Sequence, residues 1–263
     1  MAEIKLLKED KKSGKATYEI SGASPAFVNA LRRTIIDEVP TMAIETVEIS
    51  KNSSILYDEM VALRLGLVPL STDLKTYNLP KDCKCQGEGC ARCSVQMVYK
   101  SKGIGYQKIE DVESKDPKIK PVYGNMPVTK LSKGQELEFI ATAALGIGKD
   151  HSKWTPAHVW YVCKPEIKIN NSSKKIDEFR EKYPPQIFDK NGKIVKENIA
   201  EPYIIDACDG ICDDIIKIEY DKSSFVFYVE SFGQLSCKEI MQKALEIMGS
   251  HLDEFKKNLK ELA

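Results

Sequence analysis

The sequence predicts an α+β fold, and three observations lead to this prediction. An amphipathic helical pattern lies near the N-terminus at residues 24–40, and a second, longer one closes the chain from Ser236 onward. Short runs with β-type patterning occupy much of the chain between them. With 263 residues the chain is long enough for one large domain or two small ones with a substantial hydrophobic core.

The composition is that of a globular chain with balanced charge. Lys and Arg together number 39, as do Asp and Glu, so the formal net charge is zero. A nucleic-acid-binding surface needs clustered basic residues, and we therefore expect no specific DNA binding. The start MAEIKLLKED lacks the features of a signal peptide, and no apolar run approaches the ~20 residues that span a bilayer. We expect a cytoplasmic protein without membrane contact, whose eight cysteines are metal ligands or buried thiols rather than disulfides.

The first helical pattern reads SPAFVNALRRTIIDEVP. Ser24 can cap the free amides of the first turn, and Pro25 suits the first helical position. Val39 should end the helix, because the residue before a proline is disfavoured in the helical region. The apolar side chains recur at three- and four-residue steps and form one stripe: Phe27, Ala30, Leu31, Ile35 and Val39. From periodicity alone, an ordinary core helix is the simplest interpretation.

Shorter patterns fill the chain between the two helices. Strand-like runs stand at residues 4–7, 16–20, 46–50, 94–100, 136–145 and 160–162. A short helix is expected at residues 58–65, with Gly66 as its stop. Residues 101–133 are charged and interrupted by proline and glycine, which predicts long loops or hairpins.

The most specific chemical feature is a cysteine-rich loop at residues 83–93. Its four cysteines follow the pattern C-x-C-x4-C-x2-C: Cys83, Cys85, Cys90 and Cys93. Four thiolates within eleven residues can surround one tetrahedral ion at metal–sulfur distances of about 2.3 Å, and Gly87 and Gly89 let the chain fold back. We interpret the loop as a structural zinc site. Two alternatives stay open: unligated thiols, or an iron–sulfur cluster, although the C-x2-C-x2-C run of ferredoxins is absent.

Two further groups of residues carry weaker signals. Cys163, Cys208 and Cys212 have a spacing that does not predict a cluster, so we expect buried or free thiols. The run GIGKDHSKW at residues 146–154 contains a Gly-Lys pair without the spacing of a phosphate-binding loop. His151 in this run has no identifiable nucleophile partner, and we expect it to be a packed or surface histidine.

The C-terminal part predicts a β-hairpin followed by a long helix. Residues 215–220 and 225–230 flank the polar stretch 221–224, which is typical of a hairpin turn. Ser236 with Glu239 three residues later forms a capping box at the helix start. An apolar stripe then continues over about seven turns: Ile240, Ala244, Ile247, Leu252, Phe255, Leu259 and Leu262. A stripe of this length favours a partner helix, with use in the chain's own core as the alternative.

Three motifs taken together resemble one protein family. They are NALRRTIIDEVP at residues 29–40, YDEMVALRLGLVPL at 57–70 and FVFYVESFGQLSCKEIMQKALEIM at 225–248. These segments are similar to the alpha/D/third-largest subunit family of cellular RNA polymerases, most closely to its archaeal D-type members. GIGKDHSKW looks like a further signature of the archaeal and eukaryotic branch. The resemblance covers most of the chain and is weaker at residues 71–133 and 165–214.

The resemblance implies a dimerisation domain built from both chain ends, residues 1–45 and 216–263, interrupted by a mixed β insert domain at residues 46–164. The cysteine loop would be a zinc loop like that of the eukaryotic-type members. Residues 165–215 are similar to the small ferredoxin-like subdomain of archaeal members, with YPPQIF and NGK as its turn and hairpin. Most cluster cysteines of that subdomain are missing here, and Tyr183 begins the turn, so we expect no iron–sulfur cluster.

The function that the resemblance implies is that of a non-catalytic assembly subunit of DNA-directed RNA polymerase, a nucleotidyltransferase whose active site would lie in other subunits. The chain would form a heterodimer with a smaller homologous subunit. This pair, with other small assembly subunits, would be the platform for the large catalytic subunits. Scaffolds of this kind need wide apolar faces, because obligate interfaces are large and apolar. The expected interface residues are Phe27, Leu31, Arg32, Arg33, Ile35, Ile240, Ala244, Ile247, Leu252, Phe255 and Leu259, the two arginines as partners for carboxylates.

Two other functions compete with this assignment. A ferredoxin-like iron–sulfur redox protein would use the thiols, and it would show iron–sulfur absorbance. A zinc-loop nucleic-acid-binding module would bind naked DNA with a strong salt dependence, but the balanced charge argues against it. Neither alternative requires the long apolar stripe near the C-terminus.

Overall fold

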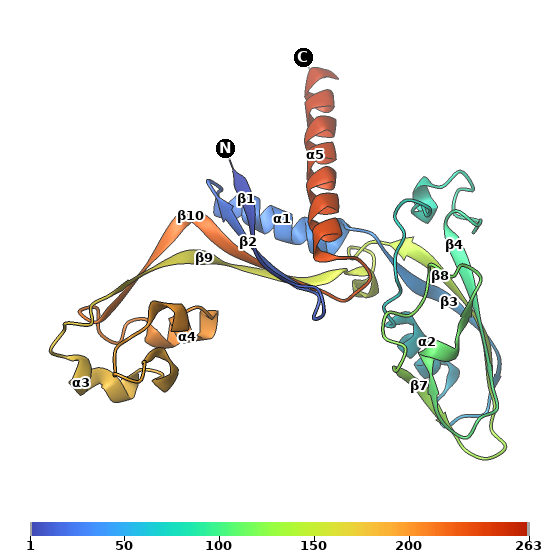
Figure 1. Ribbon diagram of the computed structural model, residues 1–263. Coiled ribbons are helices and arrows are strands. Elements are labelled where there is room, and N and C mark those ends of the chain that lie inside the picture. Colours follow the sequence, from blue (N-terminus) through green and yellow to red (C-terminus); the bar gives the residue numbers. More distant parts are fainter. Residues whose placement is uncertain (1, 262–263) are drawn as a thin grey trace. The chain divides into compact units, whose positions relative to one another are not determined.

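A computed structural model describes residues 2–261, and it confirms a mixed α+β architecture (Figure 1). One sheet has the strand order β1 (Glu3–Asp10), β2 (Lys15–Ser21), β10 (Ile216–Ser231) and β9 (Ala157–Ile169). This sheet joins strands from the N-terminal and C-terminal parts of the chain. Leu262 of the predicted apolar stripe lies outside the described residues.

A second sheet forms within the middle of the chain. Its order is β3 (Thr41–Asn52), β8 (Leu137–Gly146), β4 (Ser94–Ser101) and β6 (Glu113–Ser114), and neighbouring strands are antiparallel. A small third sheet pairs β5 (Gly105–Lys108) with β7 (Pro127–Leu131), also antiparallel. One face of the second sheet packs on a core that includes Met42, Ile44, Met97, Phe139 and Ala141.

Helices of very different length accompany these sheets. They are α1 (Pro25–Glu38), α2 (Asp58–Gly66), α3 (Ile176–Phe179), α4 (Pro202–Cys208) and α5 (Cys237–Glu261). Short 3₁₀ turns stand at residues 80–82, 109–111, 152–154, 180–182, 185–187 and 196–198. The first, second and last of the five helices lie where the sequence predicts them. No helix within the described residues combines the length and the apolar character that a membrane span requires.

The chain separates into two compact units. One contains residues 1–5, 19–25 and 161–226, and the other contains residues 6–18, 26–160 and 227–263. The first unit has its own isoleucine-rich core around Tyr183, Ile187 and Cys208. The second unit contains α1, α2, α5 and the second sheet. The three-part division predicted from the sequence stays a prediction.

The run GIGKDHSKW explains how α1 ends. The last carbonyl groups of a helix have no partner inside the helix. The backbone N–H of Lys149 donates to the carbonyl oxygen of Asp37 at 2.8 Å, and the Thr155 hydroxyl donates to that of Ile36 at 3.3 Å. A Cβ atom at Gly148 would lie 1.9 Å from the Ile36 oxygen, so this approach requires glycine. The run therefore acts as a cap on the C-terminal end of α1.

One predicted element is wrong. Residues 215–220 and 225–230 do not form a hairpin, because β10 runs without a break from Ile216 to Ser231. Asp221 accepts hydrogen bonds from the backbone N–H and the hydroxyl of Ser223, at 2.8 and 2.7 Å, as in a turn. The backbone nevertheless stays extended, because β10 lies between two neighbouring strands, and from Phe225 onward its alternate residues are buried in the sheet.

Candidate metal centre and partner-binding surface

The four cysteines of the loop at residues 83–93 come together in space. Their sulfur atoms all lie within 4.8 Å of one another. The Sγ–Sγ distance is 3.5 Å for Cys83 and Cys90, 3.5 Å for Cys85 and Cys93, and 3.9 Å for Cys90 and Cys93. Gln86, Gly87 and Gly89 have positive φ angles, which fold the chain back between the two halves of the site. The structure thus brings together every cysteine that the sequence predicts for this site.

These distances indicate a site for a single ion. A tetrahedral ion with metal–sulfur bonds of about 2.3 Å holds its sulfur ligands about 3.8 Å apart. The observed sulfur separations agree with this value. A multinuclear cluster needs a wider arrangement, because its cysteine ligands are distributed over two or more irons. The loop therefore fits one metal ion with four thiolate ligands.

Hydrogen bonds inside the loop favour the thiolate form that a metal requires. The backbone N–H groups of Arg92 and Cys90 donate to the sulfurs of Cys90 and Cys93, at 3.4 and 3.3 Å. A hydrogen bond with Cys93 lowers the pKa of the Cys85 thiol to about 6. Burial acts in the opposite direction at Cys93 and raises the pKa of that thiol to about 12. A bound cation would offset this cost of burying charge.

The three cysteines of the first unit do not form such a site. Within residues 2–261, Cys163, Cys208 and Cys212 are not part of any group of three or more ligands that could hold a metal. Cys208 is fully buried in the apolar core, and burial raises the pKa of its thiol. Tyr183 fills part of the same core, and its hydroxyl donates to the carbonyl oxygen of Cys212 at 3.4 Å.

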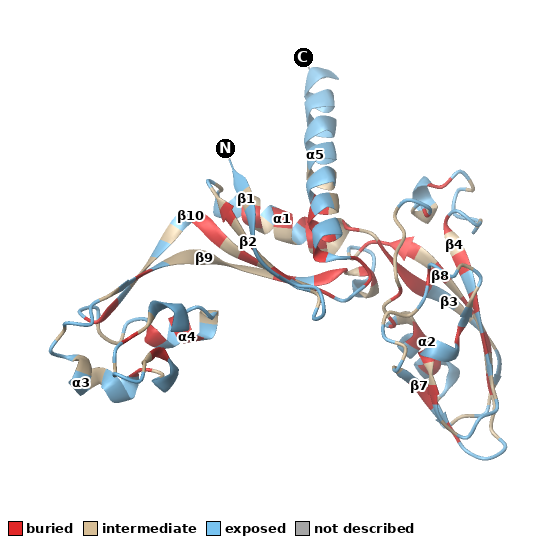
Figure 2. Cartoon of the chain, in the orientation of Figure 1, coloured by how far each residue is buried: buried red, intermediate tan, exposed pale blue. Residues whose placement is uncertain are grey.

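The predicted interface residues of α5 divide into two groups (Figure 2). Ile240 and Ala244 are fully buried within this chain, and Ile247 is half-buried. The C-terminal part leaves the other three exposed: Leu252 by 60%, Phe255 by 61% and Leu259 by 50%. All residues from 249 to 261 are exposed. The structure therefore leaves an apolar stripe uncovered on the second half of this helix.

The sequence analysis missed one member of the uncovered stripe. Leu245 is 38% exposed and lies about 20° from Leu252 around the helix axis. Ile240 and Ala244 instead point to the side of α5 that packs within the chain. Phe255 lies about 20° from Ala244 around the axis, so what separates the buried from the uncovered residues is mainly their position along the helix, all residues from 249 to 261 being exposed.

The predicted interface residues of α1 are mostly engaged within the chain. Leu31 and Ile35 are fully buried, and Phe27 is half-buried. Arg32 donates from Nε and Nη2 to Asn29 Oδ1, at 3.1 and 3.0 Å. Arg33 is exposed and lies 3.8 Å from a carboxylate oxygen one helical turn later in the same helix. α1 and α5 meet where His251 Nε2 lies 3.1 Å from Glu38 Oε2.

Comparison with known proteins identifies the family. The profile of the RNA polymerase Rpb3/Rpb11 dimerisation domain matches residues 17–252. The chain is 36% identical over 258 residues to DNA-directed RNA polymerase subunit Rpo3 of Methanosarcina acetivorans, with 96% of each chain covered. It is 36% identical over 265 residues to the Rpo3 subunit of Archaeoglobus fulgidus, covering 100% and 99% of the chains, and 35% identical over 266 residues to that of Pyrococcus horikoshii, covering 100% of both. The chain therefore belongs to the RNA polymerase Rpb3/Rpb11 dimerisation-domain family, as an assembly subunit of DNA-directed RNA polymerase.

Proposed function

We propose that this chain heterodimerises with a smaller homologous subunit through the uncovered stripe of α5 and the adjoining surface of α1. Family membership supports a heterodimer within RNA polymerase, in which this chain is a non-catalytic component. The observation that carries the finer proposal is the stripe itself, whose members are Leu245, Leu252, Phe255 and Leu259. A folded chain rarely leaves several large apolar side chains in a row unless another chain covers them.

The energetics of burial favour this use of α5. Burying one large apolar side chain contributes about 1.5–3 kcal/mol. Several such side chains buried together can offset the cost of fixing two chains relative to each other. The residues Leu31, Ile35, Ile240 and Ala244 then act indirectly, because they hold α1 and α5 in place within this chain. Arg32 and Arg33 can exchange their present helix partners for carboxylates of the partner chain.

The wider role follows from the same pair. The heterodimer would be the platform on which the large catalytic subunits and other small subunits of the polymerase assemble. The size and apolar character of obligate interfaces fit a scaffold role better than a transient one. A cytoplasmic location is part of this proposal, because archaeal transcription takes place there and the relatives are archaeal proteins.

For the cysteine loop we favour zinc over other ions, in a structural role. Four thiolates without an open position are the ligand set of structural zinc sites. Cys83, Cys85, Cys90 and Cys93 would bind the ion and thereby fix the loop between η1, the 3₁₀ turn at Pro80–Asp82, and β4. No observation within the described residues favours an iron–sulfur redox function, since the close sulfur separations suit one ion.

The interface proposal is tested with Leu252→Asp combined with Phe255→Asp in the full chain, co-expressed with the smaller homologous subunit of the same genome. We expect heterodimer affinity to fall by about 100-fold or more, because two charges would be buried without partners. Size-exclusion chromatography with light scattering and a binding titration would measure this. Thermal unfolding of the chain alone should not change, because both residues are exposed.

A matched control keeps this test specific. Tyr203→Asp introduces the same charge at a residue of α4 that is 67% exposed, and it should leave the heterodimer intact. Leu31→Asp is less informative, because Leu31 is fully buried and a charge there would unfold the chain itself. A double variant in α5 that still binds with wild-type affinity would contradict the proposed interface.

A further inference from the structure

The helix α2 carries large apolar side chains on two of its sides. Val61 and Leu65 are fully buried in the core beneath the second sheet. Met60, Leu63 and Leu67 are exposed by 47%, 54% and 54%, and they recur at three- and four-residue steps. They therefore form a second stripe on the helix and on the residue that follows it. A short surface helix needs only one apolar side to pack on its own core.

The exposed stripe of α2 continues into the segment before the helix. Ile55 is 85% exposed and Tyr57 is 80% exposed. These five exposed apolar side chains lie within thirteen consecutive residues, whereas exposed apolar residues on a protein are normally single and scattered. Tyr and Met are also among the residues enriched in the cores of protein interfaces. We define this surface as the α2 patch: Ile55, Tyr57, Met60, Leu63 and Leu67.

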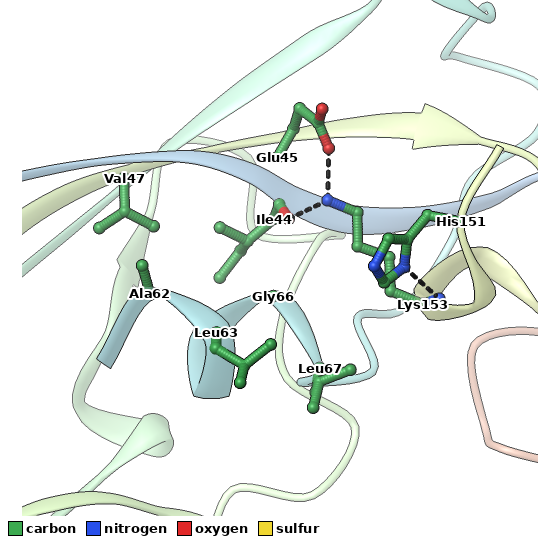
Figure 3. Close-up of a pocket in the computed structure, with 9 residues that line it drawn as sticks. All are labelled: Ile44, Glu45, Val47, Ala62, Leu63, Gly66, Leu67, His151 and Lys153. Carbon is green, nitrogen blue, oxygen red and sulfur yellow. Dashed lines mark hydrogen bonds and ion pairs between the residues drawn. The ribbon is translucent and has the colours of Figure 1, made fainter. Parts of the chain in front are cut away.

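A small cavity of about 140 Å³ adjoins the α2 patch, between α2 and β3 (Figure 3). Val47, Ala62, Leu63 and Leu67 contribute its apolar lining. The helix and the strand lie close together here, since a Cβ atom at Gly66 would be in van der Waals contact with the backbone oxygen of Ile44, at 3.7 Å. The cavity has room for one apolar side chain inserted from another chain.

Charged groups stand at the ends of this cavity. Glu45 lines it and is exposed, and Glu59 lies one helical turn before Ala62 and Leu63 on the same side of α2. Lys153 also lines the cavity; its side chain is largely buried, bonds Glu45 and donates to Ile44 O at 3.1 Å (Figure 3). Lys153 is therefore already satisfied, whereas Glu59 has no ion-pair partner within the described residues.

Two further basic residues near the α2 patch, Arg64 and His151, are engaged by backbone groups of this chain. Arg64 points away from the cavity, since its Nη2 donates to the carbonyl oxygen of Pro127 in β7. His151 is exposed, as predicted for a surface histidine, and its Nδ1 accepts a hydrogen bond from the backbone N–H of Lys153. An approaching chain thus meets an apolar surface bordered on its cavity side by carboxylates.

We propose that the α2 patch and its cavity bind a segment of another protein in which apolar side chains alternate with Lys or Arg. The apolar side chains would cover the α2 patch and fill the cavity, and the basic groups would pair with Glu59 and compete with Lys153 for Glu45. Charge complementarity argues for this occupant over a second copy of this chain, whose own carboxylates would face these ones. The same carboxylates repel a nucleic acid. This surface is separate from the α5 stripe, and the inference does not depend on the proposed heterodimer.

The test uses the full chain with Leu252→Asp and Phe255→Asp present throughout, so that the α5 stripe cannot bind the probe. The probe is the fluorescein-labelled peptide LKKLLKLLKKLLKL, and its counterpart has Glu in place of every Lys. Fluorescence anisotropy would measure both affinities at several salt concentrations. We expect the Lys peptide to bind at least about tenfold more tightly than the Glu peptide, with the difference shrinking as salt rises.

Two variants and one control locate the binding. Leu63→Asp should weaken the Lys peptide by about tenfold or more, and Glu59→Lys should reduce the preference for Lys over Glu several-fold. Ile104→Asp makes a matched change at a residue that is 72% exposed outside the α2 patch, and it should have no effect. Equal binding of the two peptides, or an unchanged affinity of Leu63→Asp, would overturn the proposal. So would self-association of the background variant that Leu63→Asp abolishes, because it would make a second copy the occupant.

Discussion

Two small regions of this chain both contain cysteines, yet different forces hold them together. The loop at residues 83–93 brings four sulfurs within 4.8 Å of one another and has little apolar core of its own. The segment at residues 165–215 leaves its cysteines dispersed and instead packs a core rich in isoleucine around Tyr183. A short loop that cannot bury enough apolar surface needs a cation to fix it, whereas the longer segment can fold without one. Cysteine content alone does not distinguish the two cases, but spacing and surroundings do.

The largest expected contrast between the two regions is in metal content. Wild-type chain should hold about one zinc ion, and Cys90→Ser should lose it after gel filtration with a weak chelator, because a ligand is removed. Cys208→Ser should retain the full amount. Plasma mass spectrometry of the three proteins would measure this. Stoichiometric iron in the wild type would refute zinc, and iron accompanied by acid-labile sulfide would restore the redox alternative.

A core substitution in the segment at residues 165–215 should affect only that segment. Ile187→Ala removes a fully buried side chain and should destabilise the segment at residues 165–215 by about 2–5 kcal/mol. Hydrogen exchange of its amides would report the change, while zinc content should stay the same. Lys190→Ala, at an exposed residue of the same segment, serves as the control. Equal protection in Ile187→Ala and the control would mean that the isoleucine core does not support this segment.

Metal removal should affect only the cysteine loop at residues 83–93. After chelation, we expect trypsin to cleave at Lys84 and Arg92 about tenfold faster, because the loop loses its fixed shape. Cleavage at Lys182 and Lys190 should keep its rate. Mass spectrometry of the early fragments would show the order of cuts. Faster cleavage in both regions would indicate that the metal stabilises the whole chain rather than the loop.

The smallest expected effect concerns thiol reactivity in the chelated protein. The thiolate is the nucleophile, and the chelated loop loses the hydrogen bond with Cys93 that lowers the pKa of the Cys85 thiol, so alkylation of Cys85 should rise as the pH approaches the ordinary thiol pKa of about 8.5. Cys208 should stay unreactive at neutral pH, because burial both shields it and raises the pKa of its thiol. Peptide mapping after iodoacetamide treatment between pH 5 and 8 would follow both residues. Re-addition of zinc should protect Cys85, and similar reactivity of the two thiols would refute the contrast.

The sequence was sufficient for features that depend on local chemistry. The cysteine spacing predicted which four sulfurs meet, and Ser236 with Glu239 predicted the start of α5. In the structure, the Ser236 backbone N–H and hydroxyl both donate to Glu239 Oε2, at 2.9 and 2.6 Å. Such contacts span only a few residues, so spacing and residue type determine them.

Structural features that depend on residues far away in the chain could not be predicted from the sequence. The turn-type residues 221–224 suggested a hairpin, but pairing with strands far away in the chain keeps β10 extended. Periodicity alone favoured a core position for Leu31 and Ile35, which are fully buried within this chain, and only the resemblance assigned them to an interface. In α2 the residues on two sides of the helix are apolar. The pattern therefore predicted a helix but did not show which of its apolar residues would be exposed.

The exposed C-terminal half of α5 has a consequence for how a complex would form. Isolated helices shorter than about 12–15 residues are only marginally stable in water, and residues 252–261, which follow the contact of His251 with Glu38, are all exposed. In the free protein these last turns should unwind and rewind rapidly, and their amides should exchange with solvent almost as fast as in a coil. Docking of another chain would then complete the helix, so association should raise the far-UV circular dichroism signal of the mixture above the sum of its parts.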